Sequence, residues 1–333
     1  MDPISKQRLW GWRHCLDTPF ARDFIIGLVV LLVAVPLVIW GLQAAGRIGN
    51  ERRAELWARY RSWLIFIPLM ILPVLLGAAW TIGAISVMSI LCYREFARAT
   101  GMFRQPDVSA LVVIGILAIT FAAADHWYGL FVAITPLLVA LIAAIALCRD
   151  EPRGYIQRVA LGILAFLLFG VCFGHLSYFS NDTNFRAILL WLITCVELND
   201  VFAYIVGKTL GRKKLAPNTS PNKTLGGALG ALVLTTTLAA FLGHFAFAGG
   251  TVDHPARLIL AGLILSVSGQ LGDLTLSSIK RDLGIKDWAA TFPGHGGLLD
   301  RFNSLLFAAP AVFHYLGYVQ GIGLDQPSRV ITG

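Results

Sequence analysis

The chain has 333 residues, of which 56% are hydrophobic and 14% are charged, with a formal net charge of +8. Ordinary soluble domains are about 45–50% apolar and about 25% charged, so this chain holds more apolar side chains than one soluble core can bury. Strand-like alternation of apolar and polar residues is absent. The composition therefore excludes soluble globular, coiled-coil, collagen-like and disordered proteins, and it indicates a helical membrane protein.

Ten apolar stretches, each close to the length that spans a bilayer, follow one another along the chain. The first begins at Phe24 and lacks a small-residue cleavage site after it, so we interpret it as a retained span. The second and third are short and are separated by Gly77-Ala78-Ala79, so they form either a tight hairpin or one bent element. The sequence thus predicts an all-α polytopic integral membrane protein with about nine to ten transmembrane helices. The stretches are 24–43, 64–79, 80–93, 108–124, 127–147, 156–177, 186–206, 225–247, 257–277 and 303–320.

The basic residues indicate which helix ends face the cytoplasm. Five alternate loops hold 20 of the 27 Lys and Arg residues, and the loops between them hold none. With ten spans these five loops lie on one side, and the positive-inside rule makes that side cytoplasmic. Membrane insertion therefore accounts for most of the positive charge without a nucleic-acid partner, although the loop 207–224 carries more than insertion requires. The basic loops are 44–62, 93–107, 149–158, 207–224 and 278–302.

Acidic residues lie inside two of the apolar stretches. A carboxylate in hydrocarbon is energetically costly and usually faces a polar cavity. Glu197 and Asp200 lie within the apolar run 187–206, and Asp273 follows fifteen uncharged residues. One such acid is compatible with a paired structural contact. The chain has acids in two apolar stretches, and each stretch leads into a basic loop. This arrangement favours a functional site over a structural contact.

The densest polar stretch of the chain runs from Gly269 to Asn303. Asp273, Ser277, Lys280 and Arg281 have the spacing of residues that share one face of a helix. The end of such a helix would present a carboxylate, a hydroxyl and two cations. This arrangement places a metal ligand beside groups that bind phosphate.

A turn-rich segment, Pro293-Gly294-His295-Gly296-Gly297, follows in the same stretch. Its small residues let backbone N–H groups approach an anion closely, as in glycine-rich phosphate loops. Asp300 and Arg301 come next, at the start of the last span. Because carboxylates are hard oxygen ligands that suit Mg²⁺, we expect Asp273 and Asp300 to meet as a metal-binding pair.

Several motifs in the chain closely resemble the signature of the phosphatidate cytidylyltransferase family. In the polar stretch they are Ser277-Ser278-Ile279-Lys280-Arg281, Lys286-Asp287 and 293–301. A second block over 200–224 and an Arg94-Glu95-Phe96 element are also similar to the family. The resemblance is strong over 186–320 and consists mainly of hydropathy before that. It implies an integral membrane enzyme that converts CTP and phosphatidate into CDP-diacylglycerol and pyrophosphate.

The resemblance also implies how the residues share this reaction. Magnesium held by Asp273 and Asp300 would neutralise phosphate charge, and Asp200 either orients a lysine or joins the cation site. His295 either donates a hydrogen bond to the leaving group or is structural. The implied catalytic residues are Asp273, Lys280, Arg281, Asp300 and Arg301. The implied substrate- and nucleotide-binding residues are Lys208, Lys214, Ser220, Lys223, Ser277, Lys286, His295, Gly296 and Gly297.

The chain departs from the family pattern at three places. Asn303 stands where the family has Asp, Val201-Phe202 stand where it commonly has Ser-Gly, and Glu197 is an additional buried acid. Asn303 and Glu197 are further candidate ligands, either for Mg²⁺ or for a second cation. We expect Glu197 to supply the negative charge that Asn303 lacks, and Asn303→Asp to be tolerated. An active enzyme is expected because Asp273 and Asp300 are both present.

Two other classes of function also fit parts of the sequence. An anion transporter would carry buried acids in ten spans, but it would predict two related halves, which the sequence does not show. A cytidylyltransferase or a CTP-dependent kinase that acts on another lipid, such as a polyprenyl type, shares the nucleotide, the metal and the membrane. The glycine-rich segment followed by Asp300-Arg301 favours the cytidylyltransferase over the kinase.

The chemistry is concentrated in the C-terminal half of the chain. We expect residues 1–150 to form a transmembrane scaffold or packing region and residues 151–333 to form the catalytic region. The active site would lie at the cytoplasmic ends of the C-terminal helices, which CTP reaches from the cytosol and a lipid phosphate reaches from the bilayer. The expected partners are CTP, phosphatidate or a similar lipid phosphate, the membrane bilayer, and a second copy of the chain in a homodimer. In a bacterium the membrane would be the inner or plasma membrane.

Overall fold

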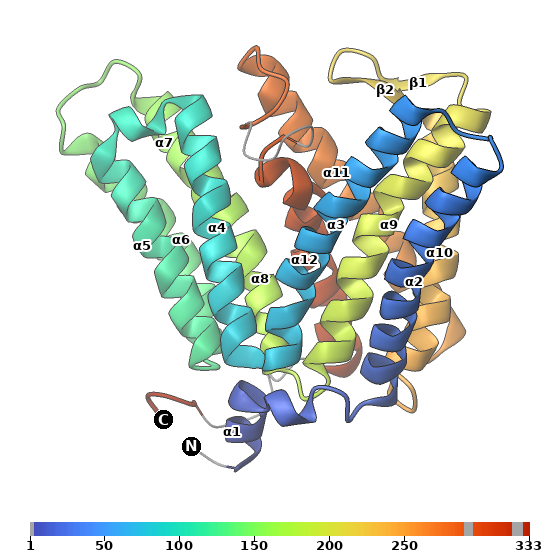
Figure 1. The fold of residues 1–333 in the computed structure, drawn as a ribbon. Coiled ribbons are helices and arrows are strands. Elements are labelled where there is room, and N and C mark those ends of the chain that lie inside the picture. The colour runs from blue at the N-terminus through green and yellow to red at the C-terminus, as the bar shows by residue number, and fades with distance from the viewer. Residues whose placement is uncertain (1–2, 290–295, 322–328) are drawn as a thin grey trace. The chain divides into compact units, whose positions relative to one another are not determined.

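The structure, a computed structural model, describes residues 3–289, 296–321 and 329–333 (Figure 1). Within these residues the chain is helical almost throughout, and eight helices are long and apolar enough to cross a membrane. The predicted all-α polytopic membrane protein is therefore confirmed. These eight are α2 (Pro19–Ala44), α3 (Asn50–Leu76), α5 (Pro106–Ala124), α6 (Tyr128–Leu147), the helical segment Tyr155–Asn181, α9 (Phe185–Leu210), α10 (Leu225–Ala246) and α11 (Pro255–Asp282). Two further long helices, α4 (Ala78–Thr100) and α12 (Leu299–Gln320), are outside this set.

The chain packs as two compact units, which meet in sequence between Thr81 and Ile82. The second unit, Ile82–Gly333, contains every residue that the sequence assigns to the site. The expected division into a scaffold or packing region, 1–150, and a catalytic region, 151–333, stays a prediction.

The first unit contains the short helix α1 (Pro3–Trp10), then α2 and α3. The expectation of a loop over 44–62 is wrong, because α3 already begins at Asn50. Its first turns are polar but rich in Arg, Glu and Ala, which form helix well, and an ion pair of 2.6 Å joins Arg59 to Glu55 one turn away. Gly77, at φ 131° and ψ 170°, ends α3 in a backbone conformation that side chains disfavour. The chain therefore forms two separate helices here, α3 and α4, and not the single bent element that the sequence allowed as one alternative.

The second unit begins with most of α4, which is followed by α5 and α6. The next span consists of α7 (Tyr155–Ala165), a π-helical segment (Phe166–Cys172) and α8 (Phe173–Tyr178). A π-helical turn displaces backbone carbonyls from their usual partners. The hydroxyl of Ser89 on α4 donates a hydrogen bond to one of them, the carbonyl of Phe169. This contact fixes α4 against the π-helical segment.

Helices α9 to α12 pack closely around buried polar side chains. Asn199 on α9 accepts hydrogen bonds from Thr235 on α10 at 3.0 Å and from Ser266 on α11 at 2.7 Å. Gly262 allows α11 to approach α10, because a Cβ there would lie 2.8 Å from the Cα of Thr236. Small residues and interhelical hydrogen bonds are the usual means of helix packing in membranes.

The basic segment after α9 is folded and not a simple loop. Strands β1 (Lys214–Ala216) and β2 (Ser220–Thr224) pair antiparallel, with Lys214 opposite Thr224. The Thr224 hydroxyl accepts a hydrogen bond from the backbone N–H of Gly227 at 3.1 Å and so caps α10. Figure 1 shows this hairpin where α9 ends and α10 begins. The cap fixes the direction in which the hairpin leaves the helix bundle.

Candidate functional site

The predicted site residues gather where α11 ends and α12 begins. Helix α11 continues through Asp282, so Asp273, Ser277 and Lys280 lie on one unbroken helix, as predicted. Ser277 and Lys280 are buried. A buried lysine requires a partner because an isolated ammonium is costly to remove from water. The partner of Lys280 is on the next helix.

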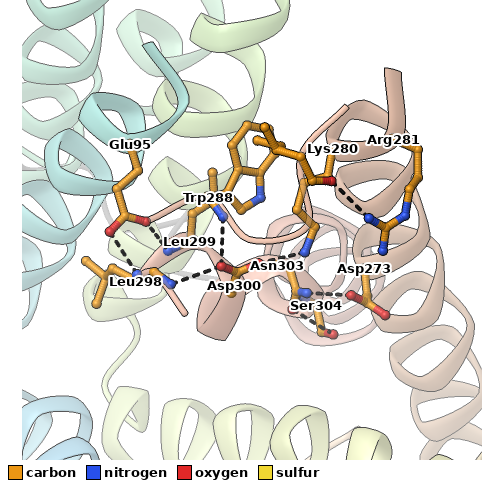
Figure 2. Close-up of polar contacts among 12 residues, drawn as sticks. Glu95, Asp273, Lys280, Arg281, Trp288, Leu298, Leu299, Asp300, Asn303 and Ser304 are labelled. Atoms are coloured by element: carbon orange, nitrogen blue, oxygen red, sulfur yellow. Dashed lines mark hydrogen bonds and ion pairs between the residues drawn. The ribbon is translucent and has the colours of Figure 1, made fainter. Parts of the chain in front are cut away.

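Asp300, in the first turn of α12, is that partner. Its Oδ1 lies 2.6 Å from the Nζ of Lys280. Its Oδ2 accepts hydrogen bonds from the backbone N–H groups of Trp288 and Gly297, both at 3.0 Å (Figure 2). The Asp300 carboxylate thus joins the end of α11, the loop after it and the start of α12.

Glu95, near the end of α4, reaches the same junction. Its Oε1 accepts a hydrogen bond from the backbone N–H of Leu298 at 3.0 Å, and its Oε2 accepts one from Leu299 at 2.9 Å (Figure 2). The first N–H groups of a helix have no partner within the helix, and the helix dipole favours a negative charge there. Glu95 therefore supplies an N-terminal cap for α12 from about 200 residues away in sequence.

Two carboxylates, those of Glu95 and Asp300, lie so close to this junction that glycine is required at positions 296 and 297. A Cβ on Gly297 would lie 2.4 Å from the Oε2 of Glu95, and a Cβ on Gly296 would lie 2.8 Å from the Oδ2 of Asp300. Gly296 also has φ +75°, a left-handed conformation that favours glycine. The anions that approach this backbone closely in the structure are therefore carboxylates of the protein itself.

Asp273 belongs to a second group of contacts on α11. Its Oδ2 forms an ion pair with the ammonium of Lys223 on β2, and its Oδ1 accepts a hydrogen bond from the carboxamide of Asn303 on α12. The Oδ1 of Asn303 in turn accepts from the backbone N–H of Ser304 at 2.7 Å. The Ser304 hydroxyl donates to Asp200 on α9 at 2.9 Å. One network thus links the hairpin and three helices.

The structure gives Asp273 and Asp300 different partners, Lys223 with Asn303 for the first and Lys280 for the second. The described residues contain no group of three or more His, Cys, Asp or Glu side chains placed to hold a metal. However, Mg²⁺ is usually bound by one or two carboxylates together with substrate phosphates. Asp273 and Asp200 are joined through Asn303 and Ser304 in one network, so this network holds carboxylates of the number and kind that Mg²⁺ takes together with phosphates.

Arg281 does not share the buried face of α11. It is exposed, and its guanidinium donates to the backbone carbonyl of Thr219 in the hairpin at 3.2 Å and to that of Ile285 at 2.9 Å. The hydroxyls of Thr219 and Ser278 lie 3.5 Å apart beside it. The described contacts of Arg281 therefore hold the hairpin and the loop after α11 in place.

The remaining predicted residues that the structure describes lie on α9, on α12, in the hairpin and in the loop after α11. Arg301 on α12 interacts electrostatically with Glu197 on α9. His295 lies outside the described residues. Lys208, Lys214 and Lys286 are exposed, and Ser220 is half-buried at the start of β2. The exposed lysines provide positive charge around the two carboxylate groups, which suits the approach of a polyanion.

Three residues that the structure places at the site were not predicted from the sequence. They are Glu95, Ser304 and Trp288, whose ring packs against that of Phe96 with centroids 5.5 Å apart. A signal was present for Glu95 and Phe96, because the Arg94-Glu95-Phe96 element belongs to the resemblance. Its position on a distant helix gave no indication that it would reach α12.

Comparison with known proteins places most of this structure in one family. The model of the "Cytidylyltransferase family" matches residues 57–319. An uncharacterised protein of Escherichia coli (strain K12), YnbB, is 29% identical over 279 residues, which cover 82% of this chain and 91% of that protein. The phosphatidate cytidylyltransferase of Bacillus subtilis (strain 168) is 34% identical over 216 residues, which are 63% of this chain and 79% of that protein. That of Staphylococcus haemolyticus is 30% identical over 252 residues, covering 74% and 92%.

Proposed function

Because this chain belongs to the cytidylyltransferase family, we propose that it transfers CMP from CTP to phosphatidate and forms CDP-diacylglycerol and pyrophosphate. The observation that carries the proposal is the set of paired charges between α11, α12 and the hairpin. Two buried or half-buried lysines lie there beside carboxylates. The relatives named phosphatidate cytidylyltransferase support the choice of substrates.

The reaction requires positioning and charge neutralisation more than proton transfer. An oxygen of the lipid phosphate attacks the α-phosphorus of CTP, a new P–O bond forms, and the bond to the β-phosphate oxygen breaks as pyrophosphate leaves. A phosphate oxygen is already nucleophilic, so the site needs no side chain that acts as a base. Its task is to hold two polyanions together and to stabilise the charge that develops on the leaving group.

The lysines of the site are suited to this task. Lys280 and Lys223 are held by Asp300 and Asp273 in defined positions, so little reorganisation is needed when phosphates approach. Arg301 and the exposed Lys286 add positive charge beside them. We assign Lys280 and Lys223 to the phosphates of the substrates, and Asp300 and Asp273 to the orientation of these two lysines.

Magnesium is part of the proposal. Asp273, with Asp200 beside it in the same network, would hold the ion. When bound, Mg²⁺ would neutralise phosphate charge and polarise the α-phosphorus for attack. The Asn303 and Ser304 side chains then serve to orient these two carboxylates.

The Lys280–Asp300 pair lies where α11 ends and α12 begins, and Asp273 lies nine residues before the end of α11. The polar hairpin and the loop after α11 are at this end, and both are among the basic loops. The positive-inside rule therefore favours a cytoplasmic site in an integral membrane protein. Such a site is open to CTP from the cytosol, while phosphatidate reaches it from the bilayer.

The test is formation of a CDP-lipid by the purified full-length protein. Labelled CTP, Mg²⁺ and phosphatidate are incubated with the wild type, and parallel reactions contain diacylglycerol or a polyprenyl phosphate. We expect CDP-diacylglycerol and pyrophosphate with phosphatidate alone. Product with only one of the other lipids would contradict the proposed substrate and support a different lipid cytidylyltransferase or a kinase.

Substitutions at the site test whether its residues carry out this reaction. We expect Asp273→Asn and Asp300→Asn each to lose more than about nine-tenths of the rate, a barrier increase above ~1.4 kcal/mol. Asp282→Asn is the matched control, because it makes the same change at an exposed position on α11. Equal rates for Asp273→Asn and Asp282→Asn would contradict the role of Asp273 in the reaction.

A further inference from the structure

Glu95 lies apart in sequence from every other residue of the site, and yet it contacts the segment that carries Asp300. Its two carboxylate oxygens accept hydrogen bonds from consecutive backbone N–H groups, those of Leu298 and Leu299, at 3.0 and 2.9 Å. The next residue is Asp300. A bidentate contact of this kind fixes both the position and the rotation of the first turn of α12.

The packing around Glu95 leaves this segment little freedom. A Cβ on Gly297 would lie 2.4 Å from the Glu95 carboxylate and 3.0 Å from the backbone nitrogen of Ala289. The adjacent side chain on α4, Phe96, is fully buried and packs its ring on Trp288 at 5.5 Å. The backbone N–H of Trp288 is in turn a donor to Asp300. Glu95 and Phe96 thus contact the segment between α11 and α12 at two places, Leu298 and Trp288.

Phe96 is itself held by the interior of the second unit. Its ring contacts that of Phe169 at 5.3 Å, and Phe169 lies in the π-helical segment whose carbonyl accepts from Ser89. Helix α4 is therefore attached to the interior of the second unit through both Phe96 and Ser89. A contact from a fixed support transmits its geometry to the group that it holds.

We propose that Glu95 is a positioning residue for the transfer reaction, and that it acts by holding the start of α12 so that Asp300 orients Lys280. This inference rests on the proposed function. Asp300 accepts from Gly297 and Lys280 at the same time, so a shift of the first turn of α12 would move the Lys280 ammonium. Displacements of about 1 Å in a catalytic arrangement can reduce the rate by ~100-fold.

The experiment compares Glu95→Gln with wild type in the full-length protein. Gln keeps the shape of the side chain, but it loses the charge and places an amide NH₂ against one of the two N–H donors. Glu51→Gln is the matched control, because Glu51 is exposed in the first turn of α3. For each protein, kcat and KM for CTP and phosphatidate are measured, and hydrogen exchange is followed in peptides that cover 296–305.

We expect kcat of Glu95→Gln to fall by about 10- to 100-fold, while each KM changes by less than about threefold. The amides of Leu298 and Leu299 are expected to exchange faster than in the wild type, and Glu51→Gln is expected to change neither quantity. Glu95→Asp keeps the charge at a shorter reach, and we expect it to recover part of kcat. Should Glu95→Gln fail to fold, Glu95→Asp carries the comparison, with a kcat between that of wild type and a tenth of it.

Three results would contradict the proposal. A kcat within twofold of wild type despite faster exchange would make Glu95 a structural cap only. Unchanged exchange would mean that Glu95 does not hold α12, and a raised KM with unchanged kcat would assign it to substrate binding. An inactive wild type would overturn the proposed function itself. If the wild type and Glu95→Gln are equally active, the role of Glu95 is contradicted but the proposed function is not.

Discussion

Asn303 illustrates how one carboxamide can orient a carboxylate. Its NH₂ donates to Asp273, and its carbonyl oxygen accepts from the backbone of Ser304. An aspartate at this position would lose the donor and would place a second negative charge against Asp273. The departure from the family pattern therefore changes the charge of the site without removing a hydrogen-bonding group.

The first prediction concerns this residue. We expect Asn303→Asp to remain active and to reach half its maximal rate at a lower Mg²⁺ concentration, because the added charge attracts a cation. Asn303→Ala leaves Asp273 without its donor, and we expect the rate to fall by about 10- to 100-fold, as for partners of metal ligands generally. Magnesium titrations of the initial rate measure both effects. An unchanged Mg²⁺ requirement in Asn303→Asp would contradict the role of Asp273 in holding the ion.

The second prediction separates two explanations for Gly297. The sequence suggested that its small size lets a substrate phosphate approach, whereas the structure places the Glu95 carboxylate against it. Gly297→Ala should overpack this contact at a cost of about 1–3 kcal/mol. If Glu95 is the obstacle, Gly297→Ala should cost less in a Glu95→Asp background, where the carboxylate is one methylene shorter. Rates and thermal stabilities of the four proteins form a double-mutant cycle, and equal losses in both backgrounds would favour the phosphate explanation.

At the scale of elements, hydropathy predicted the helices but not their polar ends. The apolar run 257–277 is α11, which continues to Asp282, and the run 64–79 is only the end of α3, which begins at Asn50. Hydropathy reports where a helix meets hydrocarbon, whereas helix formation continues wherever the backbone can pair. The hairpin over 214–224 was not predicted, because its strands have only three and five residues, too few for a clear alternating pattern.

The same limit explains which parts of the site were predicted. Spacing along one helix correctly placed Asp273, Ser277 and Lys280 together, since a helix has a fixed period. It could not show which side chains meet across helices. In the structure Asp300 pairs with Lys280, and Asp273 pairs with Lys223 of the hairpin. The expected metal-binding pair of Asp273 and Asp300 stays a prediction.

The third prediction concerns the hairpin as an element. Arg281 was assigned to the phosphates, but its described hydrogen bonds go to the carbonyls of Thr219 and Ile285. We therefore expect Arg281→Gln to release the hairpin, so that trypsin cleaves after the exposed Lys213 and Lys214 several times faster than in wild type. Lys286→Gln, an exposed charge on the neighbouring loop, is the control. Unchanged cleavage together with a higher KM for CTP would instead support a role of Arg281 in binding the substrate.

At the scale of the whole molecule, the site can react with CTP only if the helix ends nearest to it face the cytoplasm. Helix α10 has 22 residues, which at 1.5 Å per residue is about 33 Å, enough to cross a hydrocarbon layer of ~30 Å. The segments at its two ends must then lie on opposite sides of the membrane. The hairpin is at one end, and the turn that follows Ala246 is at the other. This pair of segments gives an internal control for orientation.

The last prediction uses a single cysteine at each end of α10. Asn218 lies in the hairpin turn and Ala248 in the opposite turn, and both are exposed. In a background in which the exposed Cys148 is replaced by Ser, we expect Ala248→Cys to react with a membrane-impermeant thiol reagent in intact cells. Asn218→Cys should react only after the membrane is opened, because the basic hairpin stays on the cytoplasmic side. The opposite pattern would place Lys223 and Asp273 outside the cell, where CTP is not supplied, and would contradict the proposed reaction at this site.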